Sequence, residues 1–249
     1  MKKLLLLIAV LFFAAPALAQ QPPQVVTDPS RAFVTGAIVV KGEGAAPSDR
    51  PMSRAQKKIM ALRAAKVIAL RELAEIIDGV AIFGETTIVD AAAQSDTVRA
   101  TVQGMVKGAT VAQEGYDPVN EIAVVYLSMP TTGPNGLTGQ LIPQVMSTIP
   151  PPTASYYQPQ AAPPPSPPQA YDALILDITR HSFKPALINR VLAENGEVLY
   201  DPTKIAQEIL VERGAGDYTN DVGKAKALLG ERGARNPLVV SAAGVVKNT

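Results

Sequence analysis

Residues 51–89 combine a helical spacing of apolar positions with a β-branched ending. Ser53 and Gln56 have the spacing of a capping box, in which each side chain satisfies a backbone donor at the start of a helix. Apolar and small residues then recur every three or four positions, at Ile59, Leu62, Ala65, Ala69, Leu73 and Ile76. Gly79 is a typical helix stop, and β-branched residues follow it to Val89. The pattern predicts one long amphipathic helix followed by a strand.

Further strand patterns surround this helix and predict an α+β domain over residues 32–130. The segment before the helix has a strand pattern and then a loop, at residues 32–41 and 42–50. After residue 89 come a short helical or irregular segment and two more strands, at residues 95–105, 106–113 and 121–129. The resulting order, β-α-β-β-β with one long helix, is typical of a two-layer domain.

Residues 131–170 are rich in proline and glycine, and they end in the run PPPTASYYQPQAAPPPSPP. Proline cannot donate a backbone hydrogen bond, so this density predicts a semi-rigid, polyproline-like linker between two folding units. Tyr156 and Tyr157 leave a second interpretation open, in which the segment is a ligand for an aromatic-lined groove.

Residues 171–249 have the pattern of a second, smaller α+β domain. Residues 171–178 and 237–246 have strand composition, and Asn195-Gly196 between two apolar runs is a strong hairpin signal. Two helices are expected at residues 203–213 and 221–229, each followed by a glycine. The whole chain is therefore expected to be α+β, with two small two-layer domains joined by the proline-rich linker.

The N-terminus has the pattern of a secretory signal peptide over residues 1–19, with Lys2 and Lys3 before a short apolar run. Residues 20–31 contain three prolines and predict an extended leader. The sequence predicts export to the periplasm, peripheral to the outer membrane, with no transmembrane segment after signal removal. The chain has no cysteine, so it has neither a lipid-acceptor cysteine nor disulfides.

Charge argues against a nucleic-acid-binding protein. Removal of Lys2 and Lys3 lowers the formal net charge from +1 to −1, so the basic excess of a nucleic-acid binder is missing. Basic residues between Arg54 and Arg71 could attract phosphate groups, but acidic residues reverse the sign towards Asp78. We therefore interpret this helix face as solvated or partner-facing.

The sequence offers no catalytic residues and no cofactor site. His181 is the only histidine, so a His-rich metal site cannot form. The chain has no cysteine, so a cysteine zinc cluster cannot form either. Gly42-Glu43-Gly44 partly matches a dinucleotide fingerprint, but Pro47 stands where the third glycine belongs, so we expect a turn. We expect a non-enzymatic protein with no metal and no cofactor.

One cluster of side chains after a predicted strand has the composition of a binding site. It consists of Asp177, Arg180, His181 and Lys184. Strand ends commonly carry ligand contacts, and this mixture of charges could receive an anion or a carboxylate from a partner. A solvated junction between a strand and a loop would have the same composition.

The segments RAAKVIALRELAEIIDGV (residues 63–80), TTIVD (86–90) and GMVKGA (104–109) resemble a known family. They are similar to the N-terminal domain of the flagellar assembly protein FlgT and to the related small outer-membrane lipoproteins that include FlgP, over residues 32–129. LILDITRHSFKPALINRVLAENGEVLY (174–200) is similar to a segment of exported bacterial proteins of unknown role. The resemblance implies a non-enzymatic envelope component and supplies no catalytic residue. Gln20 replaces the cysteine of the lipoprotein branch.

These observations give two functional hypotheses. The first is a periplasmic, non-enzymatic structural or assembly protein, whose partners are envelope or flagellar proteins and which could form a homo-oligomer. The alternative is a periplasmic binding module that captures a small ligand or peptide through its C-terminal domain. An enzyme ranks third, because no acid–base pair is identifiable from spacing.

Overall fold

The chain is an α+β protein, as its sequence predicts. The computed structural model describes residues 21–152, 155–156 and 170–246, so the predicted signal peptide lies outside the described residues. The N-terminal half contains α1 (Ala32–Thr35), β1 (Ala37–Ala45), α2 (Arg54–Asp78), β2 (Ala81–Phe83), β3 (Thr86–Thr87), α3 (Ile88–Gln94), α4 (Asp96–Lys107), β4 (Thr110–Asp117), β5 (Ile122–Pro130) and α5 (Leu137–Val145). The C-terminal half contains β6 (Ala173–Asp177), β7 (Ala186–Ile188), β8 (Val191–Leu192), β9 (Val198–Tyr200), α6 (Gln207–Arg213), α7 (Val222–Glu231) and β10 (Pro237–Ser241).

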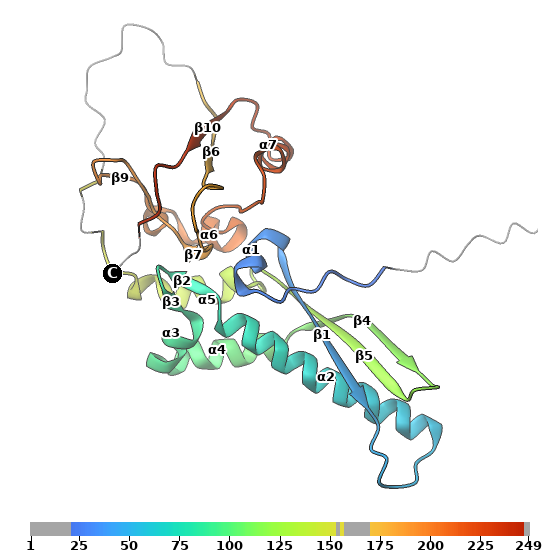
Figure 1. The fold of residues 1–249 in the computed structure, drawn as a ribbon. Coiled ribbons are helices and arrows are strands. Elements are labelled where there is room, and N and C mark those ends of the chain that lie inside the picture. Colours follow the sequence, from blue (N-terminus) through green and yellow to red (C-terminus); the bar gives the residue numbers. More distant parts are fainter. Residues whose placement is uncertain (1–20, 153–154, 157–169, 247–249) are drawn as a thin grey trace, which may run out of the picture.

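The largest sheet has the strand order β1-β5-β4, and all its neighbours are antiparallel. Figure 1 shows α2 running along one face of these three strands. The residues of β5 that face this helix are fully buried, whereas the alternate residues are half-buried. The sheet and α2 therefore form the two-layer arrangement that the sequence predicts.

The start of α2 confirms the predicted capping box. The Gln56 side chain accepts a hydrogen bond from the Ser53 N–H at 2.8 Å, and Ser53 Oγ accepts one from the Gln56 N–H at 3.2 Å. Four of the six predicted positions are buried, namely Ala65, Ala69, Leu73 and Ile76, whereas Ile59 is half exposed. Ala61 and Ile77 are also buried on this face. Small residues line the real contact with the sheet.

Glycines in β1 let α2 lie unusually close to the sheet. A Cβ atom on Gly42 would stand 2.1 Å from the Ala65 carbonyl oxygen, and one on Gly44 would stand 2.3 Å from the Ala65 nitrogen. The prediction of a loop beginning at residue 42 is therefore wrong for its first residues. The strand continues to Ala45 because glycine leaves room for the helix backbone.

The segment after α2 differs most from the sequence prediction. A strand was expected over residues 80–89, but β2 ends at Phe83 and Thr87 caps a helix, since Asp90 Oδ2 accepts the Thr87 N–H at 2.8 Å. The helical segment expected near residues 95–105 is confirmed as α4. The next strand lies at 110–117, later than predicted. β2 and β3 belong to a separate sheet from β1, β5 and β4.

The predicted linker is wrong over its first part, because α5 folds there and buries apolar side chains. Leu137, Leu141, Ile142 and Val145 have no more than a trace of exposure and belong to the main core. Pro143 lies inside this helix. Burial of the apolar face of this segment therefore stabilises the helix by more than the loss of the backbone hydrogen bond at proline destabilises it. Residues 153–154 and 157–169 of the predicted linker lie outside the described part of the chain.

The two predicted units meet through a shared sheet and a shared core. β2 pairs in parallel with β7, with Ala81 opposite Ala186 and Phe83 opposite Ile188. Figure 1 shows β7 and α6 of the C-terminal half beside β2 and α5 of the N-terminal half. Leu187, Ile188 and Leu210 belong to the same core as α2 and α5. The two halves are therefore in contact.

The C-terminal half confirms several local predictions. β8 and β9 pair as an antiparallel hairpin, and Gly196 has φ 87° in the turn between them. β6 and β10 form a separate two-stranded parallel sheet, with Leu174 opposite Leu238 and Leu176 opposite Val240. Among the described residues, no helix has both the length and the apolar character needed to span a bilayer.

Candidate binding cleft between the two halves

A cleft of about 690 Å³ lies at the junction of the two halves. One wall comes from α1 and the start of α5, through Phe33, Thr131 and Thr138. The opposite wall comes from the loop after α6 and from α7, through Tyr218, Leu228 and Arg232. This volume is within the range of small-molecule sites. Because each half supplies one wall, the cleft depends on their docking.

Tyr218 forms the aromatic base of this cleft. Its hydroxyl donates to the Ala186 carbonyl at 3.2 Å and accepts from Asn189 Nδ2 at 2.9 Å. Its ring lies between two phenylalanines, with centroids 5.7 Å from Phe33 and 6.1 Å from Phe183. Burial raises the pKa of the phenol, so Tyr218 is neutral and acts as a fixed wall.

The mouth of the cleft carries charges of both signs. Arg232 makes two contacts with the Asp217 carboxylate, at 2.5 and 2.8 Å, and both side chains remain partly exposed. The other charged lining residues are Glu212, Arg213, Lys224 and Glu231. Thr131 also lines the cleft and is 1% exposed. The arrangement can bind a polar or zwitterionic molecule.

A buried ion pair lies at the same junction. Arg190 Nε is 3.1 Å from Asp201 Oδ2, and the two side chains are 8% and 1% exposed. The N–H is not aligned for a hydrogen bond, so this contact is electrostatic. The Arg190 guanidinium also lies 4.7 Å from the centre of the Phe83 ring and donates to the Pro150 carbonyl at 2.7 Å. Arg190 therefore joins β2 and the segment after α5 to the C-terminal half.

Asp201 completes this cluster from the C-terminal half. It accepts the Tyr156 hydroxyl at 2.8 Å and the Thr203 N–H at 3.0 Å. Burial favours its neutral form, but these hydrogen bonds and Arg190 hold the pKa of Asp201 below its ordinary value. The carboxylate is therefore ionised at neutral pH and fixed in place.

The predicted binding cluster begins at Asp177, the last residue of β6, and its other three residues follow in the next loop, all outside the lining of the cleft. Asp177 Oδ1 accepts from the Thr179 N–H at 3.0 Å, which lowers the pKa of this carboxyl. His181 Nε2 lies 2.9 Å from the Ala242 carbonyl oxygen, at the end of β10. Arg180 and Lys184 are exposed. Asp177 and His181 thus hold the turn, while the two cations face solvent.

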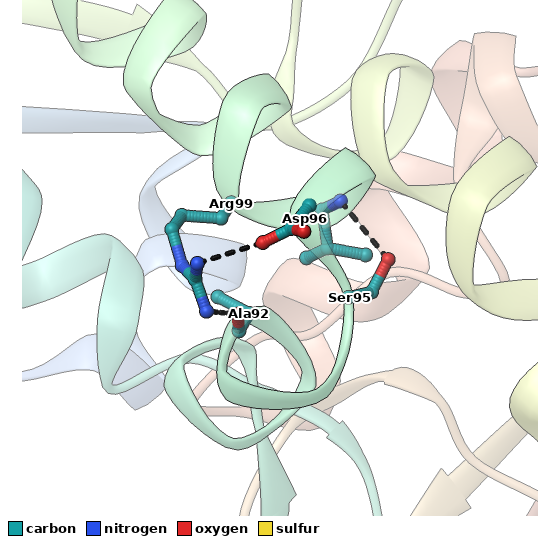
Figure 2. Close-up of polar contacts among 5 residues, drawn as sticks. Ala92, Ser95, Asp96 and Arg99 are labelled. Carbon is teal, nitrogen blue, oxygen red and sulfur yellow. Dashed lines mark hydrogen bonds and ion pairs between the residues drawn. The ribbon is translucent and has the colours of Figure 1, made fainter.

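A second, shallower hollow of about 410 Å³ lies between the end of α2, α3 and α4. Its surface is mainly apolar, with Val89, Val102 and Val106 among the lining residues. Figure 2 shows the corner beside it, where Arg99 reaches Asp96 at 2.8 Å and the Ala92 carbonyl at 2.8 Å. The contact with Ala92 joins α4 to the end of α3, and the contact with Asp96 lies within the first turn of α4.

Sequence reasoning did not identify the cleft or the buried ion pair. Phe33, Tyr218 and Arg232 come from three separate segments and share no local spacing. The nearest available signal is the placement of Arg190 and Asp201 on either side of the predicted hairpin. Within the described residues, no group of three or more histidine, aspartate or glutamate side chains could hold a metal ion.

The chain is thus an α+β protein with a cleft between its two halves, and the volume of this cleft is within the range of small-molecule sites. A family model described as Treponema pallidum Tp0624, second domain, matches residues 173–249. The match covers the C-terminal half and therefore relates one part of the chain to a domain of that protein. No curated protein matches the chain.

Proposed function

We propose that the protein is a non-enzymatic component of the cell envelope, exported to the periplasm and peripheral to the outer membrane, that takes part in building a larger assembly. Its partners are envelope proteins, and a flagellar structure is the most specific form of the proposal. The observation that supports an assembly role best is the partly uncovered β6–β10 sheet. Leu174, Leu176, Val239 and Val240 each remain 37–50% exposed there. Apolar strands left open at the surface are suited to contacts with other proteins.

A deletion strain tests this role. We expect deletion to impair motility or motor assembly and a plasmid copy of the gene to restore it. The wild-type protein should fractionate with the periplasm and should cross-link in cells to one or a few envelope proteins. A fully motile deletion strain with intact envelope structures would count against the flagellar role, and a cytoplasmic protein would count against the whole proposal.

The cleft supports a second candidate function, the capture of a small ligand or a peptide through the C-terminal half. Its depth, its neutral aromatic base and its mixed charges suit a zwitterionic molecule. Native mass spectrometry of protein purified from the periplasm would distinguish the candidates. A retained small molecule that is lost from a Phe33→Ala variant favours capture, whereas a ligand-free protein in a defined complex favours assembly.

A further inference from the structure

The β6–β10 sheet is incomplete by the standards of parallel sheets. Parallel strands normally lie in larger sheets with both faces covered, and their sequences are continuously apolar for that reason. The segments ALILD of β6 and PLVVS of β10 have this composition. Yet Val239 and Val240, successive residues of β10 on opposite faces, are each 40% exposed. The sequence of β10 is suited to a more buried position than the chain gives it.

The outer edge of β10 is open. Within the described part of the chain β10 pairs with β6 alone, and α7 packs against β6. Pro237, at the start of the strand, removes one donor, but the following residues keep theirs. Alternate backbone groups along β10 therefore point away from β6, available to a further strand.

The acidic and basic side chains around this sheet differ in their hydrogen bonding. Asp172 is engaged by the N–H groups of Arg235 and Asn236, at 2.6 and 2.9 Å, and Asp177 is engaged by Thr179. The guanidinium groups of Arg235 and Arg180 are attracted to Asp172 and Asp177 respectively, but neither makes a hydrogen bond or a close ion pair with a described residue, and both side chains are exposed.

These two exposed cations lie at opposite ends of the sheet. Arg235 precedes β10. Arg180 lies in the turn after β6, and the neighbouring His181 contacts Ala242 just beyond the end of β10. An occupant with an acidic group at each end would therefore match both cations.

The size of the surface selects the kind of occupant. Two strands of five residues span about 17 Å by about 10 Å, so each face offers roughly 170 Å². A stable dimer buries about 800 Å² on each partner. The area that a second copy of the chain would bury on this face alone is well below that value. A single extended segment fits, because strand addition takes much of its affinity from main-chain hydrogen bonds.

We propose that the outer edge of β10 receives an extended apolar segment of a partner protein as a third strand, and that acidic residues flanking this segment pair with Arg235 and Arg180. The inference rests on the proposed assembly function and names the chemistry of the partner. In this proposal Arg180, which the sequence predicts to be a binding residue, contacts an acidic residue of the partner at one end of the three-stranded sheet.

Two synthetic peptides test the proposal with the full mature protein. The first is capped Asp-Val-Thr-Val-Thr-Val-Asp, and the second has lysine in place of both aspartates. We expect the acidic peptide to bind at least about tenfold more tightly, because two added ion pairs replace two repulsions. Amide exchange should slow in β10 when this peptide is bound. Absence of binding by both peptides would overturn the proposal.

Charge reversal supplies the matched variants. The double variant Arg180→Glu, Arg235→Glu should reverse the preference and favour the lysine peptide. The control, Arg54→Glu with Arg63→Glu, reverses two exposed charges on α2 and should leave the preference unchanged. An unchanged preference in the first variant, or a reversed one in the control, would refute the pairing. A peptide-sensitive dimer in sedimentation would show instead that a second copy occupies the edge.

The same variants separate this inference from the proposed function. If the Arg180→Glu, Arg235→Glu protein restores the deletion strain fully, the edge of β10 is not the assembly site, although the assembly role stands. If the peptide binds as expected but deletion has no envelope phenotype, the strand-binding site stands and the assembly role fails.

Discussion

Removal of the Asp201 carboxylate should strongly destabilise the junction between the two halves. Asp201→Ala leaves the Arg190 charge at 8% exposure without its partner and removes the acceptor of the Tyr156 hydroxyl and the Thr203 amide. Breaking a buried ion pair from one side costs about 3–5 kcal/mol. Arg190 keeps its contacts with Phe83 and the Pro150 carbonyl, so we expect the lower end, about 3 kcal/mol.

Equilibrium unfolding in urea and thermal melting would measure this loss. For a chain of this size, about 3 kcal/mol corresponds to a fall in the melting temperature of about 6–12 °C. Glu43→Ala is the matched control, because it breaks an ion pair with Lys41 in which both side chains are 40% or more exposed. We expect a change below about 1 kcal/mol from it. Equal effects of the two variants would refute the role assigned to burial.

The double variant Arg190→Met, Asp201→Ala isolates the cost of the unpaired charge. Replacing both partners removes the buried charge as well as its counterion, so this variant should recover a large part of the loss. A double variant no more stable than Asp201→Ala would show that the other hydrogen bonds of Asp201 dominate.

The pH dependence of stability follows from the lowered pKa of Asp201. A carboxyl whose pKa is lower in the folded state contributes stability above its unfolded pKa, near 4, and loses it as the pH falls through the folded value. The difference between the wild-type protein and Asp201→Ala should therefore be largest near neutral pH and should shrink below about pH 4. A difference that stays constant down to pH 2 would contradict this account.

Three further substitutions test other parts of the structure. Gly42→Ala places a Cβ atom 2.1 Å from the Ala65 carbonyl oxygen and should destabilise the protein by about 3 kcal/mol, so an unchanged melting temperature would contradict the close packing of β1 and α2. Tyr218→Phe removes the hydroxyl that donates to the Ala186 carbonyl and should cost about 1–2 kcal/mol in urea unfolding, with an unchanged far-ultraviolet circular dichroism spectrum as the check on the fold. Burial raises the pKa of Asp78 at the end of α2, so its charge is unfavourable once the pH rises above the unfolded value. Asp78→Asn should therefore gain about 0.5 kcal/mol at pH 7 and nothing at pH 3, and an equal gain at both values would rule out ionisation as the cause.

Sequence reasoning succeeded where the structure depends on neighbours along the chain. The capping box of Ser53 and Gln56 and the turn at Gly196 each need only a few consecutive residues, and both formed as predicted. One local prediction failed: a strand was expected from residue 32, but residues 32–35 form the helix α1 although their composition is typical of a strand. A single turn of helix leaves too few residues to show a period.

The errors arose where distant segments decide the outcome. β2 ends at the turn where Gly84 has φ 58°, and its residue Phe83 pairs with Ile188 in the other half. No periodicity within residues 80–89 indicates that partner. Likewise, the glycines and prolines around α5 have the composition of a linker. Leu141 and its neighbours nevertheless fold into a helix, because α6 provides an apolar surface for them. The composition of a segment limits which secondary structures it can form, whereas its burial depends on the other segments that pack against it.

The cleft and the buried ion pair are connected through β7. Its first residue, Ala186, accepts the hydroxyl of Tyr218 at the base of the cleft, its last residue, Ile188, lies opposite Phe83, and Arg190 follows two residues later. A shift of β7 away from β2 would therefore open the cleft and separate Arg190 from the Phe83 ring together. A ligand that binds only the closed cleft must stabilise the docked halves by its binding free energy, to an extent set by its concentration relative to Kd. Such a ligand should raise the melting temperature of Asp201→Ala, whereas a peptide bound at the edge of β10 should leave the junction unchanged, so the two candidate sites can be distinguished in one variant.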